Sequence, residues 1–242
     1  MKKFFVLAVF VAGIFSVSGA TGFEDGQKEL EKENYEKALS IFKESCEKGE
    51  AYSCNEYGVM NYNGEGTAED PKTASEYYEK ACELKDSLGC YNLAKMYENG
   101  KTLKQDYQKA YDLYVKGCNG GDALSCFNAG FMNYNETGVE KDFKKAYMYY
   151  DRACKGGTKI GCNNLGLLYD RGEGVERDLY KAVEYYKEAC DGDVAVGCSN
   201  LGGMYEYGDA VKKDKDTALK LYKKGCDLGD KQGCEYYGKL KK

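Results

Sequence analysis

Apolar residues recur at helical spacing in a pattern that repeats every 36 residues along most of the chain. In each copy an alanine is followed four residues later by an aromatic residue and eight residues later by a cysteine, as at Ala182, Tyr186 and Cys190. Residues spaced in this way stack on one face of a helix. The pattern therefore predicts six equivalent helices, whose alanines are Ala38, Ala74, Ala110, Ala146, Ala182 and Ala218.

A second helical pattern follows each of these helices. In its clearest copy Cys162, Leu165, Gly166 and Tyr169 fall on one face, and Gly172 comes where a glycine commonly ends a helix. The position of Gly166 holds glycine or alanine in every copy, which lets a neighbouring helix approach closely. Because one helix pair cannot bury its apolar faces alone, this fixed period indicates a stacked repeat array.

The cysteines mark the turn between the two helices. All twelve fall into six pairs with a spacing of eight residues. In a continuous helix such residues lie ~12 Å apart, whereas a disulfide needs Cα atoms within ~7 Å, so the chain must reverse inside a bridged pair. Zinc binding is the competing interpretation, although a chain without histidine lacks the usual ligand spacing. We predict six local disulfides, Cys46–Cys54, Cys82–Cys90, Cys118–Cys126, Cys154–Cys162, Cys190–Cys198 and Cys226–Cys234.

The N-terminus has the three parts of a secretory signal peptide. Lys2 and Lys3 precede an apolar run over residues 4–15, and small residues follow at 18–20. We therefore expect a cleaved signal peptide over residues 1–20 and a secreted or periplasmic protein, because disulfides persist in such compartments. A retained membrane anchor is the alternative.

The mature chain is expected to have two parts. Phe23, Gly26 and Leu30 have helical spacing and predict an N-terminal capping helix over residues 21–33. The six cysteine-paired units then form the array over residues 34–242. A solenoid needs such a cover, because its terminal unit otherwise exposes an apolar face.

Composition narrows the range of functions. A chain without histidine has no Ser-His-Asp triad, no Cys-His dyad and no His-ligated metal, and we expect no cofactor and no metal. The formal net charge is −5, and it becomes −7 when Lys2 and Lys3 leave with the signal peptide. An acidic exported protein is a poor partner for nucleic acid.

The repeat resembles the Sel1-like repeats, which are relatives of the tetratricopeptide repeats. The resemblance lies in Asn-Leu-Gly-x-x-Tyr at 164–169, Gly-Glu-Gly-Val at 172–175 and Lys-Ala at 181–182. With a cysteine pair in every unit, the chain is similar to the Helicobacter cysteine-rich proteins of that class. The resemblance implies an all-α fold, a right-handed α/α superhelical solenoid of 36-residue helix-turn-helix repeats with one disulfide per repeat. It also implies penicillin binding and weak β-lactamase activity.

A serine β-lactamase would need a Ser-x-x-Lys motif, in which the lysine lies one helical turn from the nucleophile. Ser40 with Lys43 matches this motif, as does Ser45 with Lys48. Chance alone provides such matches in a lysine-rich chain, so Ser40 and Lys43 are weak candidates. The catalytic residues are otherwise unassigned.

A column of asparagines is the candidate for ligand binding. In tetratricopeptide relatives the matching helix lines a concave groove, and the resemblance implies that asparagine there holds the main chain of an extended peptide. An asparagine amide both donates and accepts hydrogen bonds. The alternative is that each asparagine only joins neighbouring repeats. The column lies two residues after the second cysteine of each pair and contains Asn92, Asn128, Asn164 and Asn200, with departures at Glu56 and Tyr236.

These observations predict an exported monomer that binds a peptide, a peptidoglycan fragment or a host protein in its concave groove. The alternative function is a weak hydrolase that opens β-lactam rings.

Overall fold

The computed structural model describes residues 22–242, and in this part of the chain the regular secondary structure consists of helices joined by turns and loops. The signal peptide predicted over residues 1–20 lies outside the described residues. No helix within 22–242 is long and apolar enough to cross a membrane. The helices are α1 (Gly22–Glu31), α2 (Tyr35–Glu47), α3 (Ala51–Asn63), α4 (Pro71–Glu83), α5 (Ser87–Asn99), α6 (Tyr107–Asn119), α7 (Ala123–Asn135), α8 (Phe143–Lys155), α9 (Lys159–Arg171), α10 (Leu179–Asp191), α11 (Ala195–Tyr207), α12 (Lys215–Asp227) and α13 (Lys231–Leu240).

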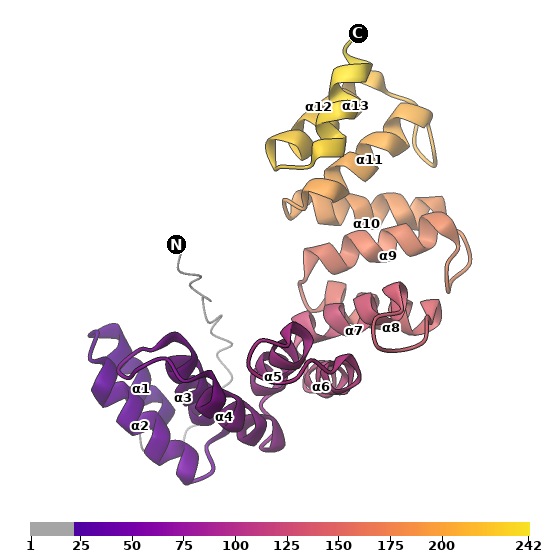
Figure 1. Ribbon diagram of the computed structural model, residues 1–242. Coiled ribbons are helices and arrows are strands. Elements are labelled where there is room, and N and C mark those ends of the chain that lie inside the picture. Colours follow the sequence, from indigo (N-terminus) through magenta and orange to yellow (C-terminus); the bar gives the residue numbers. More distant parts are fainter. Residues whose placement is uncertain (1–21) are drawn as a thin grey trace, which may run out of the picture.

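The helices stack in chain order along a curved path from α1 to α13 (Figure 1). Each helix packs on its neighbours in the chain. Contacts between odd-numbered helices of successive repeats join α1 to α3, α3 to α5, α9 to α11 and α11 to α13. In the lower part of Figure 1 the odd-numbered helices α3, α5 and α7 lie on the inner side of the bend. The predicted all-α solenoid of 36-residue repeats is confirmed.

An aspartate recurs every 36 residues directly before five of the even-numbered helices, at Asp70, Asp106, Asp142, Asp178 and Asp214. Asp106 accepts a hydrogen bond from the backbone N–H of Lys109, and the other four aspartates cap their helices in the same way. Asn34 at the head of α2 is an exception, because its amide donates instead to Glu29 at 2.8 Å. Gly172 ends α9 in the left-handed conformation, with φ 70°.

All six predicted disulfides are present. Each joins the last turn of an even-numbered helix to the first turn of the next helix, and the Cα atoms of Cys154 and Cys162 lie 4.6 Å apart. The described residues contain no free cysteine. Each repeat is therefore a covalently closed helical hairpin, with its bridges at Cys46–Cys54, Cys82–Cys90, Cys118–Cys126, Cys154–Cys162, Cys190–Cys198 and Cys226–Cys234.

The core consists of aromatic rings packed against small residues. Tyr186 on α10 is fully buried, and its ring lies directly over Gly166 on α9. A Cβ atom added at Gly166 would lie 2.9 Å from Cδ1 of Tyr186, closer than carbon atoms normally approach. The same contact recurs where Tyr78, Tyr150 and Tyr222 meet a glycine of the preceding helix. The ring is buried in every repeat, at Phe42, Tyr78, Tyr114, Tyr150, Tyr186 and Tyr222.

This packing can be tested with one methyl group. We expect Gly166→Ala to destabilise the protein by about 1–3 kcal/mol, because the added carbon forces the Tyr186 ring out of its place. Gly238 is the matched control, since it occupies the same column in α13 and a Cβ atom there meets nothing within 4 Å. Gly238→Ala should leave the melting temperature unchanged or raise it. Equal effects of the two changes in thermal denaturation would contradict this account of the core.

Candidate functional site

One face of the odd-numbered helices is left out of the core. Positions four, seven and eleven residues apart lie on one side of a helix, and in α7 these are Leu124, Asn128, Phe131 and Asn135. We call the equivalent surface of α3, α5, α7, α9 and α11 the inner face. Its first column is apolar in every copy, and the residues are 41–60% exposed: Tyr52, Leu88, Leu124, Ile160 and Val196.

The asparagine column forms the second row of the inner face, and two of its members join neighbouring repeats. Asn92 donates from Nδ2 to Oδ1 of Asn55 at 2.8 Å, and Asn200 donates to Oδ1 of Asn163 at 2.9 Å. Asn55 and Asn163 are buried. Asn92 and Asn200 therefore hold their repeats to the preceding ones.

The other two asparagines do not make this bond. The position of the preceding repeat that holds the accepting asparagine for Asn92 and Asn200 is aromatic here. It is Tyr91 for Asn128 and Phe127 for Asn164. Asn128 donates instead to the carbonyl of Leu124 in its own helix at 2.9 Å. Their amides thus remain on the inner face without joining one repeat to the next. The packing interpretation is observed for Asn92 and Asn200, and ligand binding by Asn128 and Asn164 stays a prediction.

Glu56 occupies the asparagine column in α3 and carries an unusual carboxyl group. Burial raises its pKa to about 7, and the nearby carboxylates of Asp86 and Glu65 act in the same direction. A hydrogen bond from the Asn55 amide, 3.4 Å from Oε1, opposes the shift. Glu56 therefore gains its charge near neutral pH.

The structure places Ser40 and Lys43 on the exposed surface of α2. We call α2 and the other even-numbered helices the outer helices. Neither Ser40 nor Lys43 lines either of the two cavities described below. Ser45 is buried, and Lys48 forms an ion pair with Glu44 at 2.6 Å.

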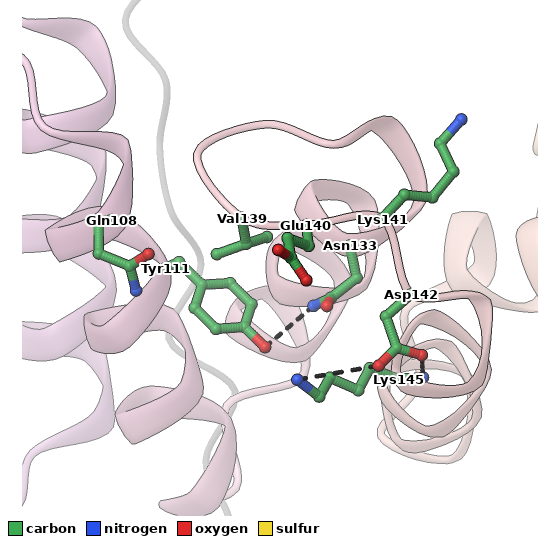
Figure 2. Close-up of a pocket in the computed structure, with 8 residues that line it drawn as sticks. All are labelled: Gln108, Tyr111, Asn133, Val139, Glu140, Lys141, Asp142 and Lys145. Atoms are coloured by element: carbon green, nitrogen blue, oxygen red, sulfur yellow. Dashed lines mark hydrogen bonds and ion pairs between the residues drawn. The ribbon is translucent and has the colours of Figure 1, made fainter.

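A cavity of 330 Å³ opens between α6, α7 and the start of α8 (Figure 2). Tyr111 and Asn133 form its wall, with Asn133 Nδ2 donating to the Tyr111 hydroxyl at 3.0 Å. Lys145 and Asp142 face each other across its edge at 3.8 Å. Its remaining lining residues are Gln108, Val139, Glu140 and Lys141.

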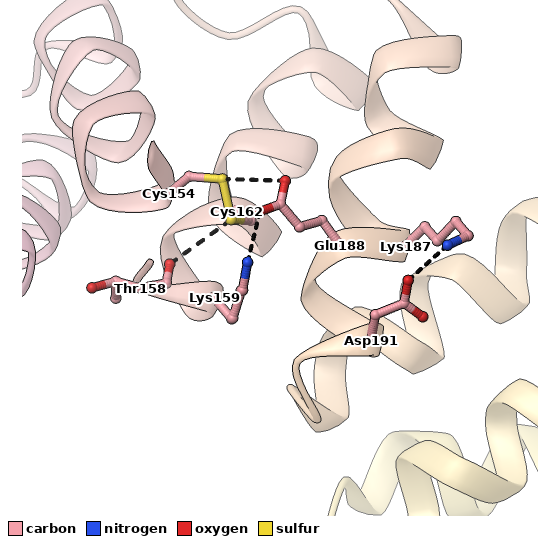
Figure 3. Close-up of polar contacts among 7 residues, drawn as sticks. All are labelled: Cys154, Thr158, Lys159, Cys162, Lys187, Glu188 and Asp191. Carbon is pink, nitrogen blue, oxygen red and sulfur yellow. Dashed lines mark hydrogen bonds and ion pairs between the residues drawn. A yellow bond between two sulfur atoms is a disulfide. The ribbon is translucent and has the colours of Figure 1, made fainter. Parts of the chain in front are cut away.

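A second cavity of 370 Å³ has Lys159 and Glu188 in its lining. Figure 3 shows these two residues next to the Cys154–Cys162 disulfide. Four of the cavity's charged residues form ion pairs, Lys159 with Glu188 at 2.8 Å and Lys187 with Asp191 at 2.7 Å. Glu188 also lies 3.8 Å from the sulfur of Cys154. Both cysteine sulfurs are used in the disulfide, so this cluster offers no thiolate for a metal ion.

The sequence reasoning missed two of these features. The apolar column could have been found, because the position two residues before each second cysteine is apolar in five copies. The cavity beside Asn133 had a fainter signal, an asparagine in a column that holds tyrosine at Tyr97 and Tyr169.

The chain was compared with models of protein families and with curated protein sequences. A sequence model described as the Sel1 repeat matches residues 20–50, 51–86, 87–122, 123–158, 160–194 and 195–230. A comparison with curated protein sequences finds no match.

Solved structures similar to this chain include a Sel1 repeat protein. A Sel1 repeat protein from Oxalobacter formigenes is 24% identical, with a TM-score of 0.83 over 93% of this chain and 89% of that one. A protective antigen of uropathogenic Escherichia coli is also 24% identical, with a TM-score of 0.84 over 90% of this chain and 48% of its own. At this identity the likeness concerns the fold. Helicobacter pylori cysteine rich protein B is 30% identical over 62% of this chain and all of its own, with a TM-score of 0.43.

The divided asparagine column predicts unequal effects on stability. Asn200→Ala should lower the free energy of unfolding by about 1–3 kcal/mol, because it leaves the buried Oδ1 of Asn163 without its donor. Asn128→Ala should change it little, since its hydrogen bond lies within one exposed helix turn. Urea denaturation of the two variants checks this, and a loss in Asn128→Ala as large as in Asn200→Ala would contradict it.

The raised pKa of Glu56 predicts a pH-dependent stability. An unfolded glutamate ionises near its ordinary value of 4.5, whereas the folded protein holds the proton until about pH 7. Stability should therefore fall as the pH rises from 4.5 through 7, by about 1–3 kcal/mol, and then level off. Glu56→Gln should remove this part of the pH dependence and be more stable than the wild type at pH 8. Identical pH profiles for the two proteins would refute the assignment.

Proposed function

The chain belongs to the Sel1 repeat family, and on that premise we propose that it is an exported interaction scaffold whose inner face binds an extended segment of a partner protein. Proteins of this repeat class mediate protein interactions, and six disulfides indicate a non-reducing environment outside the cytoplasm. Within this proposal residues 1–20 are the removed signal peptide. Residues 21–33 then form the cap, and 34–242 form the monomeric scaffold.

The exposed apolar column is the observation that carries the proposal. Folded proteins seldom expose aligned apolar side chains unless a partner covers them. Here one such residue recurs in each of five successive repeats, from Tyr52 to Val196, always on the same side of its helix. Phe131 adds a further exposed ring in the middle of the face. This spacing suits a ligand that runs along the array rather than one held in a single pocket.

The polar groups of the inner face suit the main chain of a peptide. Asn128 and Asn164 present amides that are not used to join repeats, although Oδ1 of Asn164 already accepts a hydrogen bond from Asn163 at 3.1 Å. An amide can both donate to a carbonyl and accept from an N–H group. Glu56, Lys95 and Arg171 are the charged residues among the four columns. A face with so few charges favours an uncharged, apolar segment and selects little by electrostatics.

Hydrolysis of β-lactams is the other activity that the resemblance implies. It would need Ser40 and Lys43 or another group to act from an enclosed site, whereas both residues lie exposed on the outer helix α2. Binding at the inner face needs no such site. We therefore favour binding.

The proposal is tested with a phage-displayed library of random peptides panned on the oxidised protein that begins at Thr21. The selected peptides should be rich in apolar residues. In fluorescence polarisation, Leu124→Asp combined with Ile160→Asp should weaken them at least ~10-fold, because each change places a charge in an apolar contact. Asn128→Ala combined with Asn164→Ala should weaken them less, with an unchanged melting temperature.

Met148 on the outer helix α8 provides the matched control. It is 43% exposed, against 46% for Leu124, so Met148→Asp changes an equally exposed apolar residue outside the inner face. It should leave binding unchanged, and an equal loss in this variant would overturn the proposal. The same protein is incubated with a chromogenic cephalosporin. Turnover that survives repurification and disappears in Ser40→Ala would instead support the hydrolase.

A further inference from the structure

The cavity beside Asn133 exists where one repeat lacks a ring that its neighbours have. Asn133 on α7 occupies the position of Tyr97 on α5 and of Tyr169 on α9, one period away on either side. Asn133 is 1% exposed, so this is a change in the interior of the array and not on its surface. Next to it lies the 330 Å³ cavity shown in Figure 2.

The following repeat shows how the tyrosine ring is normally held. Tyr169 is buried, and its hydroxyl forms a hydrogen bond of 3.0 Å with the hydroxyl of Tyr147. The ammonium group of Lys181 lies over its ring, 5.0 Å from the centroid. The preceding repeat places Lys109 over Tyr97 in the same way, at 5.2 Å. A cation over the face and a hydroxyl at the edge thus define the place of the ring.

The repeat of α7 keeps the groups that surround the ring and lacks the ring itself. Tyr111 and Lys145 occupy the positions of Tyr147 and Lys181, and both line the cavity. Asn133 donates to the Tyr111 hydroxyl and to the carbonyl of Ala129 at 2.8 Å. These bonds use both of its N–H groups, so its carbonyl oxygen is left to accept a hydrogen bond from a ligand.

The second asparagine in this column lacks such surroundings. Asn61 on α3 has Leu39 and Thr73 at the positions of Tyr111 and Lys145. A phenol group there would find neither the hydroxyl at its edge nor the ammonium over its face. The full set of groups is therefore specific to the repeat of α7.

We propose that the cavity between α6, α7 and α8 binds the phenol group of a ligand, whose ring takes the place of the missing tyrosine. The ring would lie under the ammonium of Lys145, as Tyr169 lies under Lys181. Its hydroxyl would donate to the carbonyl oxygen of Asn133, because the Tyr111 hydroxyl is already bonded to the Asn133 amide and to Tyr149. A tyrosine side chain of a partner and a free phenolic compound share this chemistry.

The site is independent of the function proposed for the inner face. Asn133 lies on the buried side of α7, whereas Phe131 and Leu124 point to the exposed side. Loss of peptide binding at the inner face would therefore leave phenol binding intact, and the reverse also holds.

The test is an NMR titration of the ¹⁵N-labelled, oxidised protein with p-cresol as the probe. Amide shifts should concentrate in α6, the loop over residues 136–142 and the start of α8. Asn133→Tyr should weaken p-cresol at least ~10-fold, because it fills the cavity with the ring found in the adjacent repeats. This variant should fold, since Tyr97 and Tyr169 are accommodated in the same place. Toluene, which lacks the hydroxyl, should bind more weakly than p-cresol.

Removing a ring elsewhere gives the converse test. Tyr169→Asn should create a second site beneath Lys181 and raise the number of bound p-cresol molecules from one to two. A blocked Ala-Tyr-Ala peptide separates the two ligand sources: binding at least as tight as that of p-cresol supports a protein partner, and exclusion of the peptide supports a free phenol. Unaltered p-cresol binding in Asn133→Tyr, or shifts confined to other helices, would overturn the proposal.

Discussion

The contact between a glycine on one helix and an aromatic ring on the next is the interaction on which this array depends. Where Gly166 meets Tyr186, the missing side chain allows the ring to lie against the helix backbone. A buried tyrosine removes a large apolar area from water, and an aromatic ring is buried at this position in every repeat. Because the ring needs a small residue, glycine or alanine, at one fixed position of the neighbouring helix, the period tolerates no insertion. The uniform spacing of the cysteines and aspartate caps follows from the same requirement.

The disulfides and the stacking contacts stabilise different things. Each disulfide closes one hairpin, and none joins two repeats. Between repeats the polar contacts include basic side chains that reach the C-terminal carbonyl groups of the preceding even-numbered helix. Arg152 donates to the carbonyl of Cys118 at 2.6 Å, and Lys224 donates to the carbonyl of Cys190 at 2.7 Å. Glu188 stands in this column instead of a cation and pairs with Lys159. The disulfides thus hold the two helices of each repeat together, while packing and these basic side chains hold successive repeats against one another.

The sequence predicts the structural features that depend on residues of a single repeat. The helix pairs, the aspartate caps and the disulfides are of this kind, since each arises from residues close together in the chain. The role of an asparagine in the ladder is not, because it depends on a residue of the preceding repeat. Asn92 and Asn200 find Asn55 and Asn163 there, whereas Asn128 and Asn164 find aromatic rings. The same limit explains Asn34, which bonds to Glu29 of the capping helix instead of capping α2.

A repeat array also makes departures from its own pattern informative. Each repeat shows how a given position is normally filled, so a change at one position reveals which surrounding groups have lost their partner. Glu56 replaces an asparagine and brings a buried carboxyl group to one end of the inner face. Asn133 replaces a tyrosine, while Tyr111 and Lys145 remain as they are around a tyrosine in the next repeat. Exposed positions of the repeat can vary without affecting the packing of the helices. A substitution at a buried position must leave either steric strain or an unfilled space. At Asn133 it leaves space, and the groups around that space are the ones that hold a ring elsewhere in the molecule.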